Sequence, residues 1–155
     1  MTQKTTVEAA EGQHDLFINR EFDLPLSLLF KAYSEPALLE QWMSTNVRKL
    51  ENKAHGSWRF ETTDPQGNIV FSAHGTIHTF LPDQKIIRTF EMDNAPFGVQ
   101  LEILEFEAVT DRTSRLRMHT VYETVALRDQ MLKLPFRQGL NMAHNRLQEI
   151  VSQLA

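Results

Sequence analysis

The side chains in this chain that could do chemistry are few and widely spaced. His74 and His78 lie four residues apart, a spacing at which a helix could bring two ligands to one metal ion. The segment around them alternates like a strand, in which this separation spans about 13 Å. The chain contains no Cys, which excludes thiolate nucleophiles and Cys-ligated zinc or iron-sulfur sites. The sequence therefore predicts no metal site and no cofactor.

Arg88, Tyr122 and His144 are the polar residues that could serve general acid-base chemistry, because they fall near the apolar face of a strand or of the last helix. For each of them the alternative is a buried polar group that bonds to a neighbour. The chain has no nucleophile elbow, P-loop or dinucleotide-binding glycine motif. We assign no catalytic residue and keep these three as candidates for the lining of a cavity.

The two tryptophans, Trp42 and Trp58, are open to two interpretations. Large aromatic side chains at a helix end or early in a strand usually fill the core, but they also line ligand pockets, where the indole N–H orients a partner. The methionines suit an adaptable apolar pocket and fill irregular gaps in a core equally well. These residue types alone do not separate a pocket from a filled core.

The stretch 135–154 is expected to position these side chains. Its apolar residues recur at intervals of three and four, which indicates one amphipathic helix about 28 Å long. They are Phe136, Leu140, Ala143, Leu147, Ile150 and Leu154. An apolar stripe of that length needs an equally long partner surface, which the rest of the chain supplies as a sheet.

The remaining segments predict an antiparallel meander. A half-buried strand over 14–23 precedes two short helices, one after Pro25 and one after Pro36. Turn-forming residues separate six further strands, which are predicted at 47–53, 57–63, 69–80, 85–92, 99–109 and 115–122. Short connections imply antiparallel neighbours, so we expect an α+β fold with a curved sheet of about seven strands wrapped on the long C-terminal helix.

One parity of these strands is apolar and is assigned to the face that meets the last helix. It comprises Trp58, Phe60, Ile69, Phe71, Ile77, Ile86, Phe90, Met92, Val99, Leu101, Ile103, Leu116, Met118 and Tyr122. From Leu104 the apolar parity switches, which predicts a bulge or a bend near Ile103. The residues we expect around a cavity are Trp42, Trp58, Phe60, Phe71, Ile86, Arg88, Phe90, Met92, Leu101, Met118, Tyr122, Phe136, Leu140 and His144.

Composition narrows the partners and the compartment. Residues 1–13 are small and polar, which predicts a flexible leader or a short strand extension, and 14–155 fit a single domain. A net charge of -4 without basic blocks argues against nucleic acid. No apolar run approaches the length of a membrane span, and 1–12 lack the apolar core of a signal peptide. We expect a cytoplasmic protein.

Five segments, in the right order, resemble the START-related (SRPBCC) superfamily with its helix-grip fold. They are FKAYSEPALLEQW at 30–42, GSWRF at 56–60, HGTI at 74–77, LPDQKIIRTF at 81–90, and RDQM at 128–131 followed by Gly139 and Arg146-Leu147. Within the superfamily they are similar to the branch of the activator of heat-shock-protein ATPase homologue. The resemblance implies a hydrophobic pocket between the curled sheet and the last helix, and it implies no particular reaction.

Three functions remain open at this point. The first is a binding protein for a small hydrophobic or amphipathic ligand, lipid-like or aromatic, held between sheet and helix. The second is an enzyme of the polyketide cyclase or hydrolase kind, which would use Arg88, Tyr122 or His144 in the same cavity. The third, suggested by the resemblance, is a stress-response module that contacts a chaperone through an apolar patch or forms a homodimer.

Overall fold

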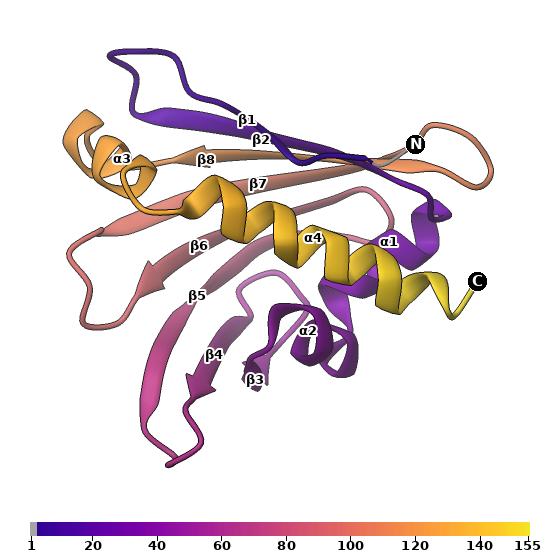
Figure 1. Cartoon of the computed structure of the whole chain (residues 1–155), viewed down its shortest axis with the longest axis horizontal. Helices are drawn as coiled ribbons and strands as arrows, with labels where there is room; N and C mark the ends of the chain where they lie inside the picture. The colour runs from indigo at the N-terminus through magenta and orange to yellow at the C-terminus, as the bar shows by residue number, and fades with distance from the viewer. Residues whose placement is uncertain (1–2) are drawn as a thin grey trace.

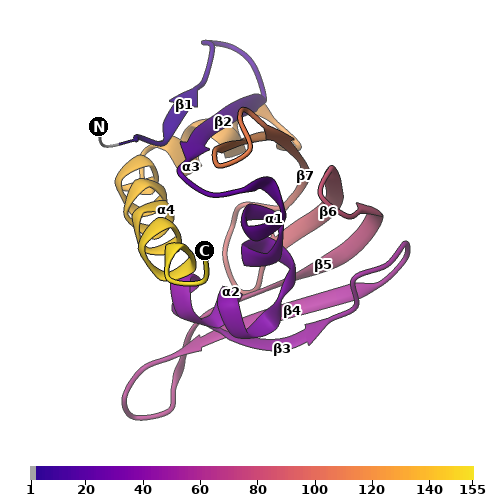
Figure 2. The ribbon, with the colours of Figure 1, turned by 90° about the vertical axis from the view of Figure 1, so that its right-hand side faces the viewer.

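A single antiparallel sheet wrapped around the last helix makes up most of the computed structural model, which describes residues 3–155. The elements in chain order are β1 Thr6–Glu8, β2 Asp15–Phe22, α1 Leu26–Ser34, α2 Pro36–Met43, β3 Asn46–Leu50, β4 Ser57–Thr63, β5 Ile69–Leu81, β6 Lys85–Met92, β7 Val99–Ala108, β8 Ser114–Val121, α3 Val125–Leu132 and α4 Phe136–Ser152. The strand order is β1-β2-β8-β7-β6-β5-β4-β3. Figure 1 shows α4 crossing the inner side of this sheet, and Figure 2 shows how the sheet curls around it. The α+β fold with a C-terminal gripped helix is confirmed.

Two elements differ from those expected. Residues 6–8, predicted to belong to a flexible leader or a short strand extension, form the separate strand β1 and pair with β2, so the sheet has eight strands rather than about seven. Residues 125–132, for which no helix was predicted, form α3, whose first turn is capped by Thr124: its Oγ1 accepts a hydrogen bond from the Leu127 N–H at 3.1 Å. The apolar residues of α3 do not share one face, which is why periodicity did not reveal it.

The expected parity switch near Ile103 is wrong. Strand β7 pairs with β6 and β8 in one continuous register. Its inward residues are all buried: Gln100, Glu102, Leu104 and Phe106. Val99 and Leu101 lie on the outer face, with 38% and 37% of their surface exposed. The apolar pattern misled because the first two inward positions of β7 are polar, and the bulges occur in other strands.

Two residues assigned to apolar inner surfaces are exposed instead. Ile69 begins β5 at the turn after β4, and Leu154 lies beyond the end of α4; each is 58% exposed. The β4–β5 hairpin extends past α4 in Figure 1. Both residues therefore lie where no opposing apolar surface reaches them.

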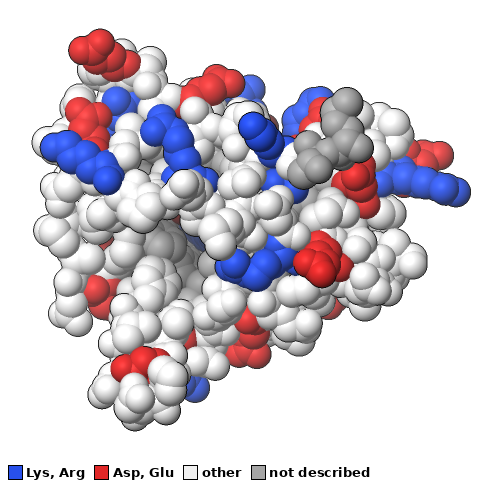
Figure 3. All heavy atoms as spheres, viewed as in Figure 1, with Lys and Arg blue, Asp and Glu red and all other residues white. Residues whose placement is uncertain are grey.

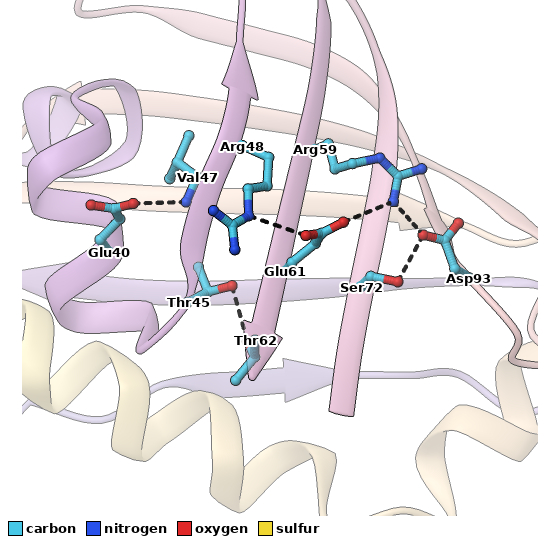
Figure 4. Close-up of polar contacts among 9 residues, drawn as sticks. All are labelled: Glu40, Thr45, Val47, Arg48, Arg59, Glu61, Thr62, Ser72 and Asp93. Carbon is cyan, nitrogen blue, oxygen red and sulfur yellow. Dashed lines mark hydrogen bonds and ion pairs between the residues drawn. The ribbon is translucent and has the colours of Figure 1, made fainter. Parts of the chain in front are cut away.

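Charged side chains on the outer face of the sheet are paired across strands (Figure 4). Arg48 Nε lies 3.1 Å from Glu61, and Arg59 Nη1 lies 2.6 Å from Asp93. Such partly solvated pairs contribute little to stability one by one. They show, however, that this face is polar and that the apolar content of these strands is directed toward α4.

Helix α4 is held on the sheet by apolar packing and by a buried polar cluster. His144 is fully buried; its Nδ1 lies 2.7 Å from Thr5 Oγ1 and its Nε2 lies 2.8 Å from the Tyr33 hydroxyl. Arg20 is buried as well, and its Nη1 donates to Thr5 Oγ1 and to Asn141 Oδ1 at 3.3 Å each. Burial, and secondarily the charge of Arg20, lowers the pKa of His144 to about 3. The imidazole is therefore neutral in the folded protein.

This neutral histidine should make stability sensitive to mild acid. Its folded pKa lies below the unfolded value of about 6.5, so its contribution is fully present above pH 6.5 and is lost as the pH falls toward 3. Between pH 6.5 and 4.5, the wild-type free energy of unfolding should fall by about 2 kcal/mol more than that of His144→Gln, whose amide can still bond to both hydroxyls. Urea unfolding of the two proteins at each pH measures the difference. Equal slopes would contradict a neutral His144.

The indole of Trp58 crosses β5 at a glycine. Trp58 pairs with Gly75, and its Nε1 donates to the Thr89 carbonyl oxygen of β6 at 3.2 Å. A Cβ at position 75 would overlap that carbonyl and lie 2.7 Å from Trp58 Nε1. Gly75 therefore lets the indole lie flat against β5. The ring in turn supports Arg88, whose Cζ is 5.1 Å from its centroid.

Substitution of this glycine should be costly. We expect Gly75→Ala to lower the free energy of unfolding by about 1–3 kcal/mol, because the methyl group forces the Thr89 backbone and the indole apart. The control is Gly139→Ala in α4, where a Cβ meets no atom within 4 Å and the better helix former should add up to about 1 kcal/mol. Urea denaturation followed by tryptophan fluorescence checks both. Equal effects at the two positions would contradict the close approach.

Candidate ligand-binding cavity

A cavity of about 220 Å³ lies between the sheet and the N-terminal half of α4. Its apolar lining consists of Ile18, Trp42, Met43, Phe90, Met92, Met118, Met131, Phe136, Leu140 and Ala143. Its polar lining consists of Tyr33, Arg88, Gln100, Glu102, Thr120 and Tyr122. Figure 3 shows the molecule hollowed beside α4, with mainly uncharged atoms around the opening.

A second, larger hollow of about 680 Å³ lies on the outer face near Gly75. It is more open than the inner cavity, and Arg48, Lys49 and Arg59 in its wall are already paired with acidic neighbours. The inner cavity combines apolar walls with a few convergent polar groups, as ligand sites do. It is the better candidate site.

Of the cavity residues expected from the sequence, eight line the inner cavity: Trp42, Arg88, Phe90, Met92, Met118, Tyr122, Phe136 and Leu140. Trp58, Phe60 and Ile86 are buried in the core and do not line the cavity, although Trp58 supports Arg88 from behind. Phe71 packs against the core from a half-buried position outside the cavity. Leu101 faces outward, because its neighbours Gln100 and Glu102 occupy the inward positions of β7.

His144, the remaining candidate, does not line the cavity. Its ring is directed toward Thr5 and toward the hydroxyl of Tyr33, so that Tyr33 stands between it and the cavity. Of the three polar residues considered for acid-base chemistry, Arg88 and Tyr122 reach the cavity and His144 does not. The sequence could not show that His144 is excluded from the cavity, because its ring contacts the hydroxyl of Tyr33, a residue of a different helix.

Several lining residues were missed by sequence reasoning. Gln100, Glu102 and Thr120 occupy inward positions of β7 and β8 that an apolar pattern cannot mark. Met131 comes from the unpredicted helix α3. The other residues missed are Ile18, Tyr33, Met43 and Ala143. The only signal in the sequence was the alternation of polar Gln100 and Glu102 with apolar Val99 and Leu101. This alternation predicts a strand but does not say which of its two faces is buried.

The polar floor of the cavity is a buried ion pair with an amide beside it. Arg88 Nε donates to Glu102 Oε1 at 2.9 Å, and Gln100 Nε2 donates to Glu102 Oε2 at 2.9 Å. The Arg88 and Glu102 side chains are 8% and 7% exposed. Removing two charges from water costs free energy that their attraction only partly returns. The pair therefore adds little to stability, and it places two charged groups in the wall of the cavity.

Hydrogen-bond donors remain unused at this floor. Within residues 3–155, the two terminal nitrogens of Arg88 and the hydroxyls of Thr120 and Tyr122 have no hydrogen-bond partner. All of these atoms retain some contact with solvent. Burial, and then the charge of Glu102, raises the pKa of Tyr122. Its phenol is therefore a neutral donor at physiological pH. Burial likewise raises the pKa of Tyr33, which bonds to His144.

The carboxylate and the imidazole nearest the cavity are already hydrogen-bonded to neighbouring side chains. Both oxygens of Glu102 accept hydrogen bonds, and the imidazole of His144 lies behind Tyr33. No group of three His, Cys, Asp or Glu side chains in the described part of the chain could hold a metal ion. The same residues include no helix long and apolar enough to cross a membrane. The cavity offers an apolar wall and oriented donors.

Solved structures share this architecture. A protein from Rhodobacter sphaeroides superposes with a TM-score of 0.84 at 21% identity, covering 96% of this chain and 99% of its own. A protein from Mycobacterium smegmatis gives 0.82 at 18% identity, covering 95% and 96%. One from Arthrobacter aurescens gives 0.83 at 17%, covering 96% and 91%. At these identities the likeness shows the fold alone. A comparison with curated proteins found no match.

A family model described as "Activator of Hsp90 ATPase homolog 1-like protein" matches residues 23–152, which is most of the chain. The match spans α1 through α4 and thus all of the polar floor. Together with the helix-grip fold it confirms the resemblance inferred from the five sequence segments. The chain belongs to the family of Activator of Hsp90 ATPase homolog 1-like proteins.

Proposed function

We propose that this protein binds a small amphipathic molecule in the inner cavity, with the apolar part of the ligand against α4 and its polar head toward Arg88. The observation that carries the proposal is the cavity itself: a space open beside α4, with apolar walls and a buried polar floor. Such a division orients a ligand, because each end of the molecule has only one favourable environment. Membership of the family is consistent with a ligand-binding domain.

The volume limits the size of the ligand. Drug-sized ligands occupy pockets of about 300–1,000 Å³, whereas this cavity measures about 220 Å³. A single aromatic ring with a short polar substituent, or a short acyl chain, matches that space. Longer lipid-like molecules would have to project from the opening beside α4 (Figure 3).

The wall of the cavity supports an adaptable specificity. Four of its residues are methionines: Met43, Met92, Met118 and Met131. Thioether side chains are flexible and polarizable, and they make favourable contacts with the edges of aromatic rings. Phe90 and Phe136 add aromatic surface. The wall therefore suits aromatic ligands of varied outline.

Filling the cavity should abolish binding without loss of the fold. Ala143 lines the cavity on α4, whereas the adjacent Met142 is 58% exposed. We expect Ala143→Phe to place a ring in the space and to reduce ligand affinity at least about tenfold, and Met142→Phe to leave affinity unchanged. The measurement is ligand-observed NMR with a panel of single-ring and short-chain compounds, after native mass spectrometry of gently purified protein.

Two results would contradict the proposal. One is a panel from which no compound binds wild-type protein at the cavity, as judged from the fluorescence of Trp42 and the shifts of cavity resonances. The other is unchanged affinity in a folded Ala143→Phe variant. A chaperone contact, a homodimer and a cytoplasmic location stay predictions of the sequence.

A further inference from the structure

We infer that the head group this cavity selects is an uncharged hydrogen-bond acceptor, such as the carbonyl of a ketone, ester or amide, in preference to a carboxylate or an amine. The inference rests on the proposed function and specifies its ligand class. It follows from two observations. The charges of Arg88 and Glu102 balance each other, and donors on Arg88, Thr120 and Tyr122 are unused.

The charges at the floor already balance. The positive charge of Arg88 is matched by Glu102 at 2.9 Å, and both side chains are almost fully removed from solvent. A ligand carboxylate at Arg88 would place a second negative charge beside Glu102, and an ammonium group would place a second positive charge beside Arg88. An unmatched charge in such surroundings is strongly unfavourable, whereas a neutral group leaves the balance intact.

The hydrogen-bonding pattern calls for a ligand that accepts hydrogen bonds, and the charge balance restricts that ligand to an uncharged one. Glu102 has no oxygen without a partner, because Arg88 and Gln100 occupy one each. A carboxylate can only accept, so its contact with Gln100 also fixes the orientation of that amide. The terminal nitrogens of Arg88 and the hydroxyl of Tyr122 are donors without partners in the described residues. A carbonyl oxygen is the complement of such donors.

The guanidinium is held in place before a ligand arrives. Its Nε is bonded to Glu102, and its face lies 5.1 Å from the centre of the Trp58 ring. Trp58 is itself fixed by its bond to Thr89 across Gly75. The guanidinium of Arg88, which lines the cavity, therefore has little freedom left to lose. This preorganisation favours a ligand that accepts hydrogen bonds from it directly.

The test uses three single-ring probes of nearly equal size: acetophenone, benzoate and benzylamine, which are neutral, anionic and cationic at pH 7. Dissociation constants for wild-type protein are measured by NMR titration of cavity resonances. We expect acetophenone to bind at least about tenfold more tightly than either charged probe. Benzoate or benzylamine that binds as tightly as acetophenone would overturn the inference and leave the proposed function standing. Failure of these probes and of the whole fragment panel would overturn both.

A charge-changing variant tests the mechanism. Glu102→Gln keeps the size of the side chain and removes the negative charge, so Arg88 should then select an anion and the affinity for benzoate should rise by about tenfold or more. The matched control is Glu105→Gln, on the exposed face of the same strand, which should leave the ranking unchanged. A folded Glu102→Gln protein that still prefers acetophenone by the wild-type ratio would overturn the inference. If that variant does not fold, the wild-type ranking decides.

Discussion

The ion pair between Arg88 and Glu102 lies beneath the apolar face of α4, where removing two charges from water costs free energy. Several surrounding features depend on it or maintain it. Gln100 completes the bonding of the carboxylate, Trp58 supports the guanidinium, and Gly75 gives the indole its place on β5. The pair is also in keeping with the register of β7, in which Glu102 pairs with Arg88 of β6 and the apolar Leu101 faces outward.

The other side of the cavity depends on how α4 is held. Apolar contacts of Leu147 and Val151 anchor its C-terminal half, and the N-terminal half is tied to the first strands through Asn141 and His144. The neutral imidazole bonds to Tyr33, whose ring is part of the cavity wall. Helix α4 is therefore hydrogen-bonded directly to a residue of the cavity wall. The cavity persists because polar contacts fix α4 at its edge, while apolar side chains fill only part of the space beneath it.

Most of the fold could be read from local patterns. Alternation identified β2 and β4 to β8 within one or two residues, and the three- and four-residue spacing identified α4, because both periodicities follow from backbone geometry alone. Helix α3 escaped because its apolar residues form no stripe, and β1 because three residues carry too short a pattern. The cavity was half predictable. Large apolar residues on the inner parity, such as Phe90 and Met118, were found, whereas Gln100 and Thr120 were not, since polarity suggests the outer face.

By itself, the sequence determined an α+β fold without cysteine, a gripped terminal helix and a resemblance to its family, because composition and periodicity are local properties. Only the tertiary structure decided that His144 turns toward Tyr33, that Leu101 faces outward and that Glu102 faces Arg88. These outcomes depend on what lies opposite each side chain, and opposing side chains come from strands and helices far apart in the chain. The same long-range packing leaves a space beneath α4. Its size depends on the volumes of side chains from several strands and helices, so no single segment of the sequence predicts it.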